Sequence, residues 1–358
     1  MTAETKANQE SSVSFPVDVI RTVAMVAVIL LHAANDLTIQ HLDQLEIYRW
    51  LTVDVYQSAG RMGVPLFLML TGALLLQPSK KDTLSVFFKK RWARIGIPFV
   101  FWGAAFFAWD FLVKQQTFTA SFIIQGVLDG PYYHFWYIYM LVGLYLLTPV
   151  LRLITANADG KIMKYFVVVW FVGASVAPLA GLFTSYHLDG NVFTITSLVG
   201  YFILGTYLLT VKISRRTLFA LISLGIGLTA IGTYAIAATI GGGRMYFFQE
   251  YLSPTMIFTT IVLFLLLNTV KPPLNKEKAG ASKVNKLLNL ISVNTLPIFF
   301  LHVIVLETIQ LGYLGFALNG NVVNSIIGVP LMTVIVLFVC IAIIVPIKKI
   351  PFVARLIG

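Results

Sequence analysis

The stretch DVIRTVAMVAVILLHAAND, residues 18–36, decides the fold class, because it is apolar for most of its length. A helix needs about 20 mainly apolar residues to cross the hydrocarbon core of a bilayer. The apolar run that contains this stretch, residues 15–37, meets that requirement. It therefore predicts a membrane-spanning helix, and the ionisable groups that it carries need a separate explanation.

The composition of the whole chain agrees with this interpretation. Of its 358 residues, 58% are hydrophobic and 11% are charged, and the mean hydropathy is +0.84. A soluble protein usually carries about 25% charged residues. These values exclude a soluble globular enzyme and a disordered chain, and the single cysteine, Cys340, excludes a disulfide-rich scaffold. We expect an all-α, polytopic membrane protein.

Ten apolar runs follow one another along the chain and predict one bundle of about ten transmembrane helices. They cover residues 15–37, 61–77, 92–113, 134–155, 163–181, 193–211, 217–239, 252–270, 288–311 and 323–346. We expect a single transmembrane domain over residues 15–346, preceded by a disordered leader at 1–14 and followed by a tail at 347–358. Three connections are distinctive: a polar outer loop at 38–60, an outer turn at 240–253 and a basic linker at 271–286.

The basic residues test this arrangement, because they concentrate on the cytoplasmic side of membrane proteins. With the N-terminus inside, all but four of the 26 basic residues fall on the inner side; the exceptions are Arg49, Arg61, Lys114 and Arg244. The alternation predicts that both termini are cytoplasmic and that the chain is a multi-pass protein of the cell (cytoplasmic) membrane. The net charge of +11 is then a consequence of topology, and we expect no nucleic-acid partner.

The first span carries the strongest functional signal. Arg21 and His32 are eleven residues apart, which at about 100° per residue places them within about 20° of one helix face and about 16 Å apart along the axis. Asp18 and Asp36 flank them at helical spacing. Arginine suits phosphate groups, and histidine is the side chain best able to move a proton near neutral pH. The alternative is that His32 hydrogen-bonds a neighbouring helix while Arg21 extends to the membrane surface.

Basic residues also crowd the start of the third span, in FFKKRWARIGIPFVFW at 87–102. Arg91 and Arg94 are helical neighbours and could grip one anion together, such as a 3′-phosphate or a pyrophosphate. An ordinary positive-inside anchor explains the same residues.

Two later spans add candidates for substrate binding. His134, Trp136 and Tyr137 could form a wall that stacks on a sugar ring, although aromatic residues at a span end also form the usual interfacial belt. His302 and Glu307 fall inside the ninth span, where ionisable groups are costly and often functional. A purely structural histidine and a glutamate at the outer helix end are the alternatives.

Other kinds of chemistry find no support in the sequence. It contains no phosphate-binding loop with lysine and serine or threonine, no cysteine–histidine set with zinc spacing and no Gly-x-Ser-x-Gly segment. We therefore expect neither nucleotide hydrolysis nor a metal.

The motifs together resemble the acyltransferase-3 family of integral membrane acyltransferases, over nearly the whole chain. The matching segments are Arg-x10-His at Arg21 and His32 with the acidic Asp18, GVPLFLMLTGALL at 63–75, Arg91 and Arg94, His134 and Trp136, and Leu301 and His302. Thr71 stands where serine is commoner in the family, and Pro297 where glycine is common.

The resemblance implies transfer of an acyl group from a coenzyme A thioester to a hydroxyl of a carbohydrate or glycolipid. Acetyl-CoA is the first expectation, and succinyl or another acyl group stays open. Arg21, Arg91 and Arg94 would hold the donor's phosphates, and His32 would be the general base, assisted by Asp18 or Asp36. The chain resembles short members that O-acetylate surface glycans. Its partners would be membrane lipids and the acceptor, with homo-oligomerisation left open.

A transporter from another functional class is the alternative. Ten spans with interrupted helices and buried ionisable groups also suit a secondary transporter or flippase of a glycan or lipid-linked sugar. The two classes differ in their product, because a transporter leaves the mass of its substrate unchanged.

Overall fold

The computed structural model describes residues 3–35, 47–77, 82–183, 198–240, 242–270, 283–318 and 323–358. Throughout these ranges the regular elements are helices, which confirms the all-α fold class. Eight helical stretches are long and apolar enough to cross a membrane, and a bent pair of helices makes up to nine. The protein is a multi-pass membrane protein.

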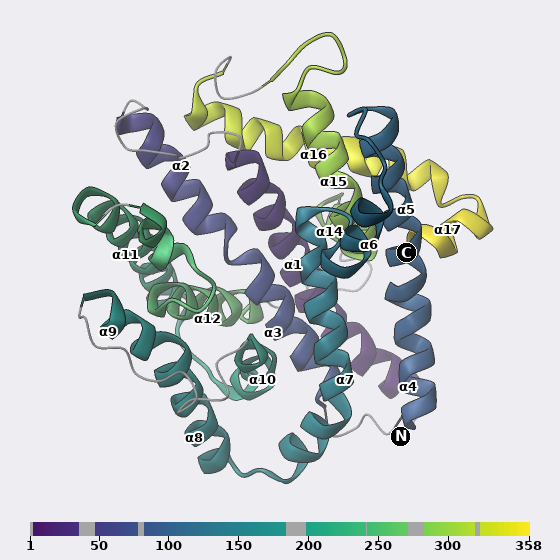
Figure 1. Cartoon of the computed structure of the whole chain (residues 1–358). Coiled ribbons are helices and arrows are strands. Elements are labelled where there is room, and N and C mark those ends of the chain that lie inside the picture. The colour runs from purple at the N-terminus through teal and green to yellow at the C-terminus, as the bar shows by residue number, and fades with distance from the viewer. Residues whose placement is uncertain are drawn as a thin grey trace.

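The helices form one bundle, shown in Figure 1. In chain order they are α1 (Ala3–Ala34), α2 (Ile47–Gly60), α3 (Gly63–Leu75), α4 (Leu84–Arg91), α5 (Ile97–Leu112), α6 (Ala120–Asp129), α7 (Trp136–Asn157), α8 (Gly160–Phe171), α9 (Ala177–Phe183), α10 (Val199–Tyr207), α11 (Arg215–Thr239), α12 (Pro254–Asn268), α14 (Lys283–Val293), α15 (Thr295–Gln310), α16 (Ser325–Ile347) and α17 (Pro351–Ile357).

Helix α1 lies at the centre of the bundle, where it packs against α2, α3, α12, α14, α15 and α16. Small residues permit this close packing, as is common between membrane helices. A Cβ atom added at Gly63 of α3 would lie 2.8 Å from the carbonyl oxygen of Ala24 in α1. One added at Gly72 would lie 1.7 Å from the carbonyl oxygen of Phe202 in α10. Glycine at these two positions therefore sets how near α3 comes to both neighbours.

The limits of several described spans differ from the sequence prediction. In the described part of the predicted sixth span, 193–211, the nine-residue helix α10 is followed by a short 3-10 turn, Leu208–Thr210, and residues 193–197 lie outside that part. The predicted outer loop, 38–60, includes helix α2, which continues through α3 as one membrane-crossing stretch, Ile47–Leu75. Helix α1 is assigned from Ala3, and its membrane-crossing part is Pro16–Ala34. The disordered leader expected at 1–14 stays a prediction.

The C-terminal region also departs from simple expectations. The predicted ninth span, 288–311, consists of α14 and α15, which are bent by 80° where they meet at Asn294. Pro297 stands in the first turn of α15, where the missing N–H costs little. The predicted tail contains helix α17, which packs on α5, and Trp102 Nε1 donates to the carbonyl oxygen of Ile357 at 3.2 Å. The cytoplasmic placement of both termini stays a prediction.

Candidate functional site

A cavity of about 340 Å³ lies beside α1, and we call it the arginine cavity. Arg21 from α1, Arg91 from the last turn of α4 and Arg94 from the next segment all line it. That segment, Trp92–Gly96, is a π-helical turn between α4 and α5. The three cations that the sequence indicated as a phosphate grip therefore share one cavity, although they come from two distant parts of the chain.

Among the described residues, the three guanidinium groups form no salt bridge, although Asp18 lies near enough to Arg21 to attract it. No carboxylate of the described residues lies within 4.0 Å of any of the three. The guanidinium carbon of Arg91 lies 5.4 Å from the ring centre of Phe87 and 5.7 Å from that of Tyr145. These aromatic faces orient the arginine without neutralising it. The cavity is therefore electropositive and suited to a phosphorylated ligand.

Three imidazole rings meet further along the bundle, and we call them the histidine cluster. The ring centres of His32 and His302 are 5.2 Å apart, and those of His134 and His302 are 5.6 Å apart. His32 also lies 5.3 Å from the ring of Tyr133. His134 comes from the short 3-10 segment Tyr133–Phe135 before α7, and His302 from α15. Three regions of the chain thus converge on His32.

Backbone contacts determine the proton position on His302. Its Nδ1 lies 2.6 Å from the carbonyl oxygen of Phe299 and 3.2 Å from that of Ile298. Because carbonyl oxygens only accept hydrogen bonds, Nδ1 carries the proton and donates, and the lone pair of a neutral ring is on Nε2. That Nε2 atom is buried and has no partner among the described residues, and neither ring nitrogen of buried His134 has one. The cluster therefore has unused polar atoms that a bound hydroxyl could satisfy.

An ionic network lies beyond the cluster along α15, where Glu307 follows His302 by five residues, or about 7.5 Å. Lys114 Nζ lies 2.8 Å from Glu307 Oε2 and 3.8 Å from Asp110 Oδ1. The hydroxyl of Tyr132 donates to Glu307 Oε1 and contacts Lys114. The Tyr132 ring packs 5.1 Å from that of Tyr133, which contacts the cluster. The network joins the end of α5 to α15.

Comparison with known protein families identifies the family of this chain. The sequence model of the acyltransferase-3 family, described as an acyltransferase domain, matches residues 16–345. The chain belongs to this family. No curated protein and no solved structure matches the chain. It is therefore a membrane acyltransferase that uses an acyl donor.

This acyltransferase brings most of the predicted site residues together, in two groups. Arg21, Arg91, Arg94 and Tyr137 line the arginine cavity, and His32, His134 and His302 form the histidine cluster. Glu307, predicted to bind substrate, has its carboxylate engaged by Lys114.

Two further predicted residues, Asp18 and Trp136, make other contacts, and a third cannot be placed. The carboxylate of Asp18 accepts hydrogen bonds from Ser292 at 2.6 Å and Asn289 at 3.3 Å. It is fourteen residues from His32 in the same helix, about 21 Å away, so it does not contact the imidazole. Trp136 packs on Tyr251, with ring centres 5.6 Å apart. Asp36 lies outside the described residues.

Several neighbours of the candidate site were not among the predicted site residues. Tyr145 and Thr71 line the cavity, and Lys114, Tyr132 and Asp110 build the ionic network. Their residue types are common in span ends and interfacial belts, so type alone gives no signal. Lys114 offered one hint, because it is among the few basic residues that the topology places outside.

Proposed function

We propose that this acyltransferase moves an acyl group from acyl-CoA, with acetyl-CoA as the expected donor, to a hydroxyl of a carbohydrate or glycolipid in the cell membrane. The observation that carries the proposal is the arginine cavity, which lies next to the histidine cluster. The arginine cavity holds three guanidinium groups that form no salt bridge among the described residues, which suits the phosphates of a phosphorylated thioester. The imidazoles next to it suit proton transfer at the thioester end.

The arginine cavity supplies the donor side of the proposal. Coenzyme A carries a 3′-phosphate and a pyrophosphate, and guanidinium groups bind such anions through paired N–H donors. Arg91 and Arg94 sit together on one helical segment, and Arg21 faces them from α1. The donor's thioester arm would then extend along α1 from Arg21 toward His32.

The histidine cluster supplies the chemistry. His32 would take the proton of the acceptor hydroxyl while the hydroxyl oxygen attacks the thioester carbonyl. The new ester C–O bond forms, the C–S bond breaks, and the proton passes from His32 to the departing thiolate to give the free thiol of coenzyme A. Nε2 of His302 can accept a hydrogen bond from the acceptor sugar, because its own proton is on Nδ1.

The donor site can be tested by equilibrium binding to the purified full-length protein in nanodiscs. Acetyl-CoA and its 3′-dephospho analogue would be titrated against the unaltered protein, Arg91→Ala and Arg94→Ala. A charge-assisted hydrogen bond contributes about 1.5–3 kcal/mol, so each variant should bind acetyl-CoA about 10- to 150-fold more weakly. The variant that lacks the arginine bound to the 3′-phosphate should bind acetyl-CoA and the 3′-dephospho analogue with equal affinity.

Arg215→Ala is the matched control, because Arg215 begins α11 and does not line the arginine cavity. Its affinity for acetyl-CoA should equal that of the unaltered protein. Equal losses in all three variants would refute a specific phosphate grip. Absence of any acyl-CoA binding would refute the donor, and a glycan that crosses the membrane with unchanged mass would then establish transport.

A further inference from the structure

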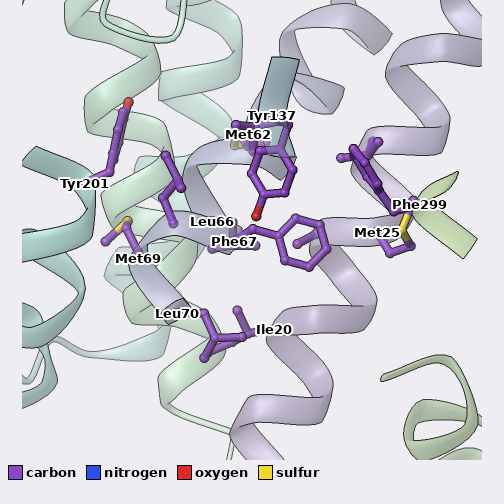
Figure 2. Packing of buried hydrophobic residues seen from close by; sticks show 14 of the residues in the cluster. Ile20, Met25, Met62, Leu66, Phe67, Met69, Leu70, Tyr137, Tyr201 and Phe299 are labelled. Atoms are coloured by element: carbon purple, nitrogen blue, oxygen red, sulfur yellow. The ribbon is translucent and has the colours of Figure 1, made fainter. Parts of the chain in front are cut away.

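Three buried aromatic rings pack in a row at the arginine cavity, and we call them the aromatic layer. Phe67 of α3, Tyr137 of α7 and Phe299 of α15 all line the cavity. The ring of Tyr137 lies 6.3 Å from that of Phe67 and 5.3 Å from that of Phe299. Figure 2 shows the Tyr137 hydroxyl directed toward Phe67. Each side chain is at least nine-tenths buried, so the rings are held from all sides.

One ring of the aromatic layer, that of Phe299, is also in contact with the histidines. The ring of Phe299 lies 5.4 Å from that of His134 and 6.0 Å from that of His302, and none of the three histidines lines the cavity. Ring centres at such distances are in direct contact. Phe299 therefore touches both the arginine cavity and the histidine cluster, and a group that travels from the cavity to His32 enters a space already crowded by rings.

The position of the layer bears on one part of the donor only. All acyl-CoA molecules share the same phosphates and the same arm, which would occupy the cavity. The acyl group is the part that differs, and it has to lie at the histidine cluster for its carbonyl to approach His32. An acyl group can displace buried rings that contact one another only at a cost in packing free energy. This cost grows with each methylene added to the acyl group.

We propose that Phe67 and Phe299 form a size filter that admits a short acyl group to the histidine cluster and excludes longer ones. The inference rests on the proposed acyl-CoA donor and adds the class of acyl group to it. The filter acts by steric exclusion: Phe67 limits the passage from the α3 side, and Phe299 limits the space against His134 and His302.

Binding measurements test the filter without knowledge of the acceptor. Coenzyme A, acetyl-CoA, butanoyl-CoA and octanoyl-CoA would be titrated against the unaltered protein, Phe67→Leu and Phe299→Leu in nanodiscs. We expect the unaltered protein to bind acetyl-CoA well and octanoyl-CoA at least about tenfold more weakly, since one methylene in a closed pocket can be worth that much. In either leucine variant the octanoyl-to-acetyl affinity ratio should rise by about tenfold or more.

Phe300→Leu is the matched control. Phe300 is the neighbour of Phe299 in α15 and is fully buried, but it stacks on Trp102 and contacts Phe135 instead of lining the cavity. Its affinity ratio should stay at the unaltered value. Coenzyme A itself reports folding, because it lacks an acyl group and every intact variant should bind it equally.

The outcomes separate the filter from the function on which it rests. An unchanged ratio in a Phe67→Leu or Phe299→Leu protein that still binds coenzyme A refutes the filter alone. Equal affinity of the unaltered protein for acetyl-CoA and octanoyl-CoA also refutes it. If the unaltered protein binds no thioester and no coenzyme A, the donor proposal fails and the filter fails with it.

Discussion

The ion pair between Lys114 and Glu307 offers a quantitative test of the site's outer side. Its atoms are 2.8 Å apart, and the two side chains are only 21% and 17% exposed. Coulomb's law gives about 6 kcal/mol at an effective dielectric constant of 20 and about 1.5 kcal/mol at that of water. Because removal from water offsets part of this attraction, we expect a coupling free energy of roughly 2 kcal/mol.

A double-mutant cycle measures this coupling directly. The free energy of unfolding would be determined in detergent micelles for the unaltered protein, Lys114→Met, Glu307→Gln and the double variant. Each single variant should have a lower free energy of unfolding than the unaltered protein. The loss in the double variant should be smaller than the sum of the two single losses, and the difference is the coupling free energy. The reason is that Lys114→Met leaves the largely buried Glu307 carboxylate without its cation, and Glu307→Gln leaves Lys114 with only the longer contact to Asp110.

A second pair in the same protein provides the control. Lys90 and Asp82 also lie 2.8 Å apart, but their side chains are 56% and 26% exposed. The same cycle there should give less than about 1 kcal/mol, as for other water-exposed pairs. A coupling for Lys114 and Glu307 no larger than that of the exposed pair would refute the argument from burial, and Glu307 would again be a candidate for binding substrate.

Three further outcomes follow from the structure. His32→Ala should lower acyl transfer by about 10²- to 10⁴-fold, measured as acyl-glycan formed per unit time, while the affinity for acetyl-CoA stays unchanged. Gly72→Ala should destabilise the protein by about 1–3 kcal/mol or more because the new methyl group would meet the Phe202 carbonyl; Gly143→Ala, with open space around it, should leave the melting temperature unchanged or raise it. Cys340 is fully buried, so a maleimide should label the chain only after unfolding, as mass spectrometry would detect.

The sequence predicted the parts of the site that depend on local spacing. Arg21 and His32 share one unbroken helix, so a fixed rotation per residue was enough to place them along one face. Arg91 and Arg94 could be paired for the same reason. The meeting of His32 with His134 and His302 lies beyond such reasoning, because the three residues belong to α1, the segment before α7, and α15. Only the packing of whole helices determines it.

The error over helix α2 has a particular physical cause. Hydropathy counts Asp54 as a sign of a water-exposed loop, yet its side chain is fully buried. Gln249, also fully buried, donates its amide to Asp54 Oδ1 at 2.6 Å. This hydrogen bond joins residues that are nearly two hundred positions apart in the sequence, so neither one alone indicates that both are inside. Partnered polar residues of this kind are what single-sequence hydropathy misjudges.

The continuity of helix α1 fixes the distance between the two ends of the proposed donor site. Its membrane-crossing part, Pro16–Ala34, is continuous, so backbone geometry fixes the interval between Arg21 and His32 at about 16 Å. A donor anchored by its phosphates and attacked beside His32 has to span that interval with its own arm. Truncated thioesters that keep the acyl group but lack the phosphate-bearing end could reach His32 but would lose the contact with Arg21. The length of this continuous helix segment therefore selects donors by the length of their arm, independently of the shape of any pocket.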